Sequence, residues 1–302
     1  MFDGPLAASA YEVLGVDPSV GDEELRRAYR LRLRETHPDT GGDAALFIRV
    51  QRAWEHIGTA QDRAAYDRGR QETSWGPTAS APRHGTRPRT KAYGQAGAWR
   101  RRRYLQLLAD HLGREVTPRE AYDPAIVRSA PWGVRRMLAD ALAEESTAAA
   151  MDDLGIGYTA WHDVICGPDG AWKLDHVVLS PTGLYGLVSE DFGDAVRFKQ
   201  GEMIGRTVGG STPVADLLSR MRWIAREARV RFGGAILILP DDDLDQPATV
   251  LGSVRGVPVA VVRRSALRTV LRSGIPGARP FGITETFDVR TRLNATARVL
   301  VP

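Results

Sequence analysis

Three adjacent residues, His37, Pro38 and Asp39, are the first feature of the sequence whose types and order suggest chemistry. Proline fixes the backbone and removes a hydrogen-bond donor, so the tripeptide predicts a rigid bend. In such a bend the His37 imidazole can bond across the loop, and the Asp39 carboxylate can be offered to a partner. A simple turn also uses proline and aspartate, because both are turn formers. No nucleophile or metal-ligand pattern surrounds the tripeptide in the sequence, so we expect binding here rather than catalysis.

Two helices are expected to position this bend. The helix that begins near residue 21 has an apolar stripe at Leu25, Ala28 and Tyr29, the spacing typical of one helix face. The helix after the bend repeats the pattern at Phe47, Val50, Trp54 and Ile57. Because a short loop joins them, they should pair antiparallel with their stripes inward. Shorter helices are expected at residues 8–14 and 61–68.

The first of these two helices also carries arginines away from its apolar stripe. Arg26, Arg27 and Arg30 form a basic face that suits an acidic partner surface. Such a face raises the association rate and sets orientation more than it adds affinity. The alternative interpretation is a solvated helix face with no partner.

In order along the chain, YEVLGV, DEELRRAYR, HPD, FIRVQRAWEHIG and DRAAYD resemble the J domain of DnaJ-type co-chaperones, over about residues 9–68. The resemblance implies an all-α domain in residues 1–70, built on an antiparallel helical hairpin. It also implies docking onto a DnaK-class ATPase chaperone through Arg26, Arg27 and Arg30, with residues 37–39 as the trigger of that partner's ATPase. The sequence departs from the family at Arg32, Glu35 and Thr36, where leucine, a basic residue and an aromatic residue are usual. A Gly/Phe-rich segment and a CxxCxGxG repeat are both missing after residue 70, so the J domain is fused to something else.

The next segment is basic and poor in apolar residues. Residues 71–113 hold 7 Arg and 1 Lys against 2 acids, whereas residues 1–70 hold 10 Arg against 12 acids. Its composition predicts a flexible basic linker over residues 71–98, followed by a helical connector over residues 99–137. Arg100, Arg101, Arg102 and Arg103 open the connector and form a candidate nucleic-acid contact, for phosphate or an acidic lipid surface. A solvated basic cluster is the alternative.

The second half alternates helices with strand-sized runs. A helix is expected at 134–154, then strands at 158–165, 174–179 and 184–188, a helix at 214–232, and strands at 235–240 and 257–262. This order predicts an α+β or α/β fold around one mixed sheet, over residues 138–275. Residues 276–302 are expected to be a C-terminal extension.

This half resembles the nuclease-related NERD domain, within the restriction-endonuclease-like fold. The segments that carry the resemblance are AEESTAAAMDDLG and WHDVICGPDGAWKLDHVVLSPTGLYGLVSEDFGD. The family implies a helix acid, an Asp-His pair and an acid-x-Lys, which hold a divalent cation and activate water. Asp175 matches the Asp of the pair, but the other positions fall on Thr147, Val188 and Glu190. We therefore expect a degenerate, non-enzymatic domain with neither metal nor cofactor.

Composition limits the remaining possibilities. The chain of 302 residues is 43% apolar, with 41 Lys+Arg against 37 Asp+Glu, which predicts a globular chain long enough for two domains. Its longest apolar runs are far shorter than the roughly 18 to 20 residues of a membrane span. The single cysteine, Cys166, excludes an intramolecular disulfide and a multi-cysteine zinc module. The N-terminus does not resemble a secretory signal, so we expect a cytoplasmic protein.

The principal hypothesis is a J-domain co-chaperone that a degenerate nuclease-like domain directs to its target. One alternative is a nucleic-acid-associated protein that binds through the basic linker and the NERD-like domain. The other is an active metal-dependent nuclease. The client and the identity of the particular chaperone are left open by the sequence.

Overall fold

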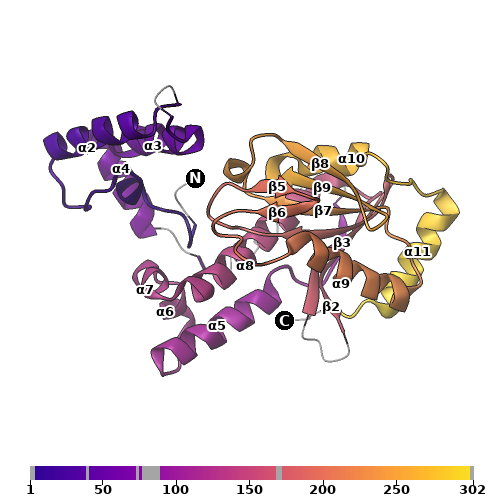
Figure 1. Ribbon diagram of the computed structural model, residues 1–302. Coiled ribbons are helices and arrows are strands. Elements are labelled where there is room, and N and C mark those ends of the chain that lie inside the picture. Colours follow the sequence, from indigo (N-terminus) through magenta and orange to yellow (C-terminus); the bar gives the residue numbers. More distant parts are fainter. Residues whose placement is uncertain (1–3, 39–40, 73–74, 77–88, 168–171, 300–302) are drawn as a thin grey trace. The chain divides into compact units, whose positions relative to one another are not determined.

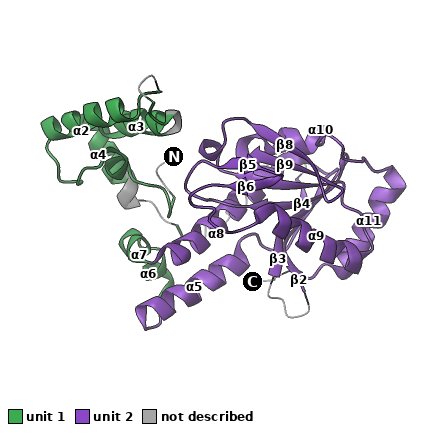
Figure 2. Cartoon of the chain, in the orientation of Figure 1, with its two compact units in different colours: residues 1–77, 116–130 green, residues 78–115, 131–302 purple. Residues whose placement is uncertain are grey.

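The computed structural model describes residues 4–38, 41–72, 75–76, 89–167 and 172–299. The chain divides into two compact units, which Figure 2 colours separately: residues 1–77 with 116–130, and residues 78–115 with 131–302. The two units are considered one at a time below. None of the helices within the described ranges combines the length and hydropathy required to cross a membrane.

The first unit begins with a small helical core. Its first four helices are α1 (Ala10–Leu14), α2 (Asp22–Glu35), α3 (Ala44–Ile57) and α4 (Ala60–Glu72). The predicted apolar stripes are confirmed at Leu25, Val50 and Ile57, which are buried together with Tyr11 and Leu14 of α1. The α2 and α3 helices pack against each other, and Figure 1 shows them side by side.

The DRAAYD segment anchors α4 to α1. Tyr66 accepts a hydrogen bond from the Ala10 backbone N–H at 2.9 Å. The Tyr11 hydroxyl donates to Asp67 at 3.0 Å and accepts from Arg63 at 3.0 Å. These side chains explain why a polar helix with few apolar residues folds back onto the core.

The predicted connector at residues 99–137 is not one element. The α5 helix (Ala98–Leu112) belongs to the second unit, whereas the short helices α6 (Pro118–Ala121) and α7 (Pro124–Ser129) belong to the first. Each short helix starts with proline directly after a side-chain N-cap, Thr117 and Asp123 respectively. Proline is well tolerated there because the first helical N–H groups have no partner within the helix.

A seven-stranded mixed sheet forms the centre of the second unit. In spatial order its strands are β1 (Lys91–Tyr93), β2 (Thr159–Cys166), β3 (Trp172–Ser180), β4 (Gly183–Ser189), β7 (Gly234–Leu239), β9 (Val257–Arg263) and β8 (Ala248–Val254). The β1–β2, β4–β7 and β7–β9 pairs are parallel, and the remaining pairs are antiparallel. A separate antiparallel pair consists of β5 (Arg197–Lys199) and β6 (Glu202–Ile204).

Helices cover both faces of this sheet (Figure 1). On one face, α9 (Pro213–Ala228) and α11 (Ile283–Thr296) contribute to a large apolar core with β2, β3, β4 and β7. On the other face, the C-terminal end of α8 (Trp132–Met151) and α10 (Leu267–Ser273) form a second apolar cluster. Short 3-10 turns occupy Asp152–Leu154, Asp241–Asp243 and Arg264–Ala266. The unit is thus an α/β domain with a mixed sheet, as the order of elements predicted.

The boundaries differ from the predicted ones in three places. Residues 91–93, expected in the linker, form β1 because they pair with residues 159–161 of β2. The strand β8 was not predicted, since a bulge between Val250 and Gly252 interrupts its alternation. The expected C-terminal extension contains α11, whose Val289 and Leu293 are buried in the core. Residues 73–74 and 77–88 of the predicted linker lie outside the described residues.

Candidate functional site

The bend after α2 is held by backbone contacts on both sides. Thr36 ends the helix, because its N–H and its hydroxyl both donate to the Arg32 carbonyl, at 3.0 and 2.8 Å. Gly42 donates to the His37 carbonyl at 3.0 Å, and Gly41 donates to the Pro38 carbonyl at 3.0 Å. A Cβ at position 42 would lie 2.3 Å from the Thr36 carbonyl carbon, so only glycine fits this close approach.

Within the bend, His37 is half-buried and Pro38 is exposed. The His37 ring meets the Phe47 ring of α3 edge-on, with centroids 5.1 Å apart and an 84° angle between the planes. This contact links the bend to the second helix of the hairpin. Asp39, the third predicted residue, lies outside the described residues.

The basic face of α2 is open. Arg26, Arg27 and Arg30 are exposed, and their guanidinium groups make no hydrogen bond or ion pair to the described parts of the chain. On the opposite side Tyr29 stacks on Trp54 of α3, with centroids 4.4 Å apart. The predicted arginines therefore point away from the packing face, where a partner can reach them.

Arg32, which stands where leucine is usual in J domains, has a local packing explanation. The Arg32 guanidinium lies beside Gly15 at the end of α1, where an added Cβ would sit 2.9 Å from its Nη2 atom. It also pairs with Glu35 at 3.3 Å. The neighbouring Leu33 packs on the core, whereas Leu31 is 53% exposed. The register of α2 thus buries leucine at position 33 and leaves an arginine over the end of α1.

Residues 9–67 match the family model described as the DnaJ domain. This segment is a J domain. The DnaJ chaperone protein of Cereibacter sphaeroides is 37% identical over 91 residues, which cover 29% of this chain and 22% of that protein. Those of Thermosynechococcus vestitus and Bordetella bronchiseptica are 44% identical over 66 and 62 residues, covering 21% and 19% of this chain and 18% and 17% of the relatives. The chain thus spans about a fifth of the length of these relatives, and the match concerns the J domain, whereas the family of the α/β domain is not identified.

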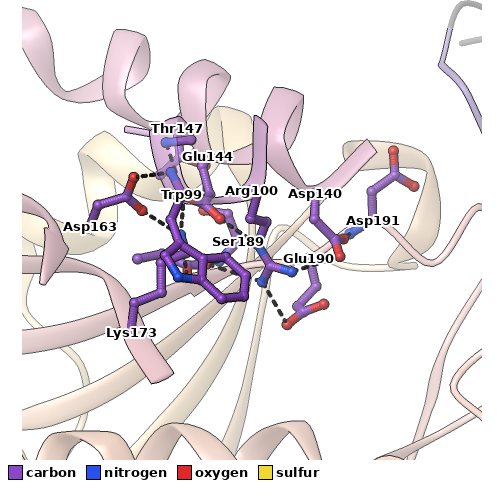
Figure 3. A network of polar contacts seen from close by, with 12 residues as sticks. Trp99, Arg100, Asp140, Glu144, Thr147, Asp163, Lys173, Ser189, Glu190 and Asp191 are labelled. Carbon is purple, nitrogen blue, oxygen red and sulfur yellow. Dashed lines mark hydrogen bonds and ion pairs between the residues drawn. The ribbon is translucent and has the colours of Figure 1, made fainter. Parts of the chain in front are cut away.

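Unlike the J domain, the α/β domain buries several charged side chains. A cluster of ionisable side chains lies between α5, α8 and the β2–β4 end of the sheet (Figure 3). We call it the charge cluster; its members are Arg100, Arg136, Asp140, Glu144, Asp163, Lys173, Asp175 and Glu190. Carboxylates outnumber cations in it.

Lys173 is the inner cation of the charge cluster. It lies two residues before Asp175 on β3, so both side chains project from the same face of the strand. The Lys173 Nζ donates hydrogen bonds to Glu144 of α8 and to Asp163 Oδ1 at 2.5 Å, and it forms an ion pair with Asp175 Oδ1 at 3.1 Å. The Ser189 N–H completes the site by donating to Asp175 Oδ2 at 2.9 Å.

Arg100 is the outer cation, and it enters from α5. Its Nη1 bonds to Asp140 at 2.9 Å and its Nε bonds to Glu144 at 2.5 Å. Its Nη2 lies 3.9 Å from Asp175 and 3.7 Å from Glu190. Asp140 and Glu144 are four residues apart on α8, which places both carboxylates on one helix face.

Burial and mutual attraction act in opposite directions on these groups. Burial alone lowers the pKa of Arg100 and of Lys173, but the surrounding carboxylates raise both pKa values above their usual range. Burial also raises the pKa of Asp175, yet Lys173 and Arg100 hold it below its usual value. Burial raises the pKa of Asp140 to about 7, and burial with repulsion from Asp175 raises that of Glu144. Burial and mutual repulsion thus favour the neutral forms of Asp140 and Glu144, whereas Lys173 and Arg100 favour the charged form of Asp175.

A neutral histidine pair lies next to the charge cluster. The Nδ1 atoms of His162 and His176 are 2.8 Å apart, so one ring donates and the other accepts. Burial lowers the pKa of His162 to about 4 and that of His176 well below its usual value. On its other side His176 meets the Ser189 hydroxyl at 3.3 Å, and Ser189 donates to Thr147 at 2.9 Å.

The structure brings together only part of the site that the resemblance predicted. Asp175 and Glu190 do meet around Arg100, whereas Val188 is an apolar core residue. The helix carboxylate comes from Glu144, one turn before the expected Thr147. The predicted site did not include Lys173, Asp140, Asp163 and Arg136. They could have been found as charged residues at positions that the strand and helix patterns assign to the interior.

These residues do not fit a divalent cation. Every carboxylate that faces the centre of the charge cluster is engaged by Arg100, Arg136 or Lys173. No group of three or more metal-ligating side chains with suitable geometry occurs among the described residues. The side chains of Arg100, Arg136 and Lys173 occupy the positions between these carboxylates that a metal ion would need.

The four connector arginines do not form one surface. Arg100 is 9% exposed and Arg101 is 6% exposed, because α5 turns both toward acids of α8. Arg101 pairs with Glu145, as Arg100 pairs with Glu144. Only Arg102 and Arg103 are exposed, so at most two of the predicted four can contact nucleic acid.

Proposed function

We propose that this chain is a J-domain co-chaperone that docks on a DnaK-class chaperone and stimulates its ATPase. The observation that supports this most directly is the open basic face of α2 beside a bend fixed by Phe47 and Gly42. Arg26, Arg27 and Arg30 have no competing partner in the described residues, so they are available to an acidic surface. His37, Pro38 and Asp39 are the residues proposed to act on the partner.

The arginines and the tripeptide have different roles in this proposal. Exposed arginines steer the encounter and fix the orientation of the complex. The bend then has to bind one conformational state of the partner better than the other, because only differential affinity shifts an equilibrium. A bend held in place before binding loses little conformational entropy on docking.

Single-turnover ATP hydrolysis by a purified DnaK-class chaperone tests the proposal with the full-length chain. We expect the wild type to accelerate hydrolysis and His37→Gln to abolish the acceleration. Arg68→Glu is the matched control, because Arg68 is exposed on α4 of the same domain. An absence of stimulation by the wild type contradicts the proposed function.

For the α/β domain we propose a non-catalytic binding module, related to the NERD fold, that directs the J domain to its target. The support is the charge cluster, in which Arg100 and Lys173 engage the acids that a nuclease needs for its metal. DNA or RNA incubated with Mg²⁺ or Mn²⁺ should stay intact. Cleavage that is abolished by Asp175→Ala would instead establish an active nuclease.

A second candidate function is nucleic-acid association, and one surface favours it. Arg222 and Arg226 lie four residues apart on the exposed face of α9, and Arg229, also exposed, is the C-cap of this helix. This candidate predicts binding to duplex DNA that weakens as salt is added. A plot of log affinity against log salt concentration should have a slope of about −0.9 for each phosphate that the protein neutralises. Reversing these three charges should reduce that slope, whereas reversing Arg102 and Arg103 tests the contribution of α5.

A further inference from the structure

A cavity of about 290 Å³ opens beside the charge cluster, entirely within the α/β domain. Its walls come from α8, the end of β4, the segment after β6 and the first half of α9. Trp132 and Phe192 form its aromatic side, and Arg136 and Glu190 form the side shared with the charge cluster. Thr207 and Arg220 line the remaining wall.

Two polar groups of this cavity lack protein partners. The Thr207 hydroxyl is buried and makes no hydrogen bond to the described residues. The Arg220 side chain is half-buried, and no described residue pairs with its guanidinium. The Thr207 hydroxyl has almost no accessible surface, so Arg220 is the donor that a molecule in the cavity can reach.

The charged groups on the opposite wall are already satisfied. Arg136 bonds to Asp140 at 2.8 Å and also to Glu190. It lies over the Phe192 ring at 4.1 Å and faces the Trp132 ring at 5.8 Å. The positive charge left for a ligand is therefore that of Arg220.

We propose that this cavity binds a small organic oxyanion, a phosphate monoester or a carboxylate, with an apolar group attached. The oxyanion would accept charge-assisted hydrogen bonds from the Arg220 guanidinium, which is a good donor to such oxygens. The apolar group would lie against Trp132, which lines the cavity and is 47% exposed. The volume matches the lower end of ordinary small-molecule sites.

The acids of the cavity select against a polymer. Asp140, Glu190 and the exposed Asp216 also line the cavity. Their field opposes several phosphates placed side by side more than it opposes one oxyanion, whose charge the Arg220 guanidinium can offset. A small molecule therefore fits the charges better than a polynucleotide does.

Isothermal titration calorimetry on the full-length protein tests the proposal, with phenyl phosphate, benzoate and a 20-nucleotide single-stranded DNA as probes. We expect saturable binding of phenyl phosphate or benzoate; the tighter of the two identifies the oxyanion class. Arg220→Gln should weaken binding roughly tenfold, since it removes a charge-assisted hydrogen bond.

Arg231→Gln is the matched control, because Arg231 is an exposed arginine of the same domain that does not line the cavity. It should bind the probe as the wild type does, and circular dichroism should show both variants folded. The proposal is overturned if neither small anion binds at millimolar concentration. Equal affinities of Arg220→Gln and wild type, or binding of the oligonucleotide alone, would overturn it as well.

Discussion

The J domain and the α/β domain both carry a run of arginines near the start of a helix, and they use it in opposite ways. On α2, Arg26, Arg27 and Arg30 are exposed and pair with no described residue, so they form a surface. On α5, Arg100 and Arg101 are buried and paired with acids of α8. The same residue type thus serves recognition in one region and internal structure in the other. The deciding factor is whether a neighbouring element supplies carboxylates.

The largest effect is expected on the stability of the α/β domain when the buried ion pairs of Arg100 are removed. Arg100→Met leaves Glu144 and Asp140 without their outer cation in a buried site, so the α/β domain should lose about 3–5 kcal/mol. Urea unfolding, with hydrogen exchange to assign the domain, measures the loss. Adding Glu144→Gln should restore part of it, because the buried charge is removed as well. A loss below about 1 kcal/mol would contradict the assigned role of Arg100.

The buried histidine pair predicts the next largest effect, which depends on pH. The folded pKa of His162 is about 4, against 6.5 for an ordinary histidine. Between these values the unfolded chain binds a proton that the folded chain does not, so stability falls as pH falls through this window. The contribution of His162 amounts to about 3 kcal/mol between pH 7 and pH 4.

Unfolding of wild type and His162→Gln across this pH range isolates the effect. The variant should show a shallower loss of stability on acidification. Asp140 acts with the opposite sign, since its pKa is raised to about 7 and the folded state holds its proton longer than the unfolded state does. Parallel pH profiles of the two proteins would contradict the neutral histidine pair.

A smaller effect is expected in the bend of the J domain. Gly42→Ala forces a Cβ to within 2.3 Å of the Thr36 backbone, so the bend must shift. We expect a loss of about 1–3 kcal/mol, the range usual for overpacking, together with weaker stimulation of the partner's ATPase. Gly21→Ala is the control, because a Cβ there meets open space. Thermal unfolding and the ATPase assay measure the two effects. If Gly42→Ala kept the stability and the stimulation of the wild type, the close approach at position 42 would be contradicted.

The smallest effect on stability belongs to the open arginines. Arg26→Glu and Arg27→Glu should change the free energy of unfolding by less than about 0.5 kcal/mol, as surface substitutions usually do. The same variants should slow association with a DnaK-class chaperone, most strongly at low salt. Stopped-flow association at two ionic strengths measures this. An unchanged association rate would contradict the proposal that the basic face of α2 is part of the docking surface.

The J domain could be predicted because its signals are local. Apolar stripes, the tripeptide at 37–39 and the Gly15 cap each lie within one turn or one bend of the residues they organise. The sequence therefore predicted its helices to within a few residues. What it did not predict is the position of Arg32 over the end of α1, which depends on packing between two helices.

The charge cluster could not be predicted in the same way. Arg100 and Arg102 are neighbours in one run of arginines, and only the acids of α8, some forty residues away in sequence, distinguish them. The strand β1 was hidden in a segment rich in glycine and proline, because its order depends on pairing with β2. In α11 the exposed Ile283 and Phe287 obscure the stripe formed by Val289 and Leu293. These features depend on long-range contacts.

The most direct test of the central claim compares three variants in single-turnover ATP hydrolysis by a DnaK-class chaperone. The full-length wild type should accelerate hydrolysis, His37→Gln should abolish the acceleration, and Arg27→Glu should reduce it strongly. Arg102→Glu, which alters an exposed arginine of the other domain, should behave as the wild type. Failure of the wild type to stimulate, or equal damage from Arg102→Glu and Arg27→Glu, would contradict the account.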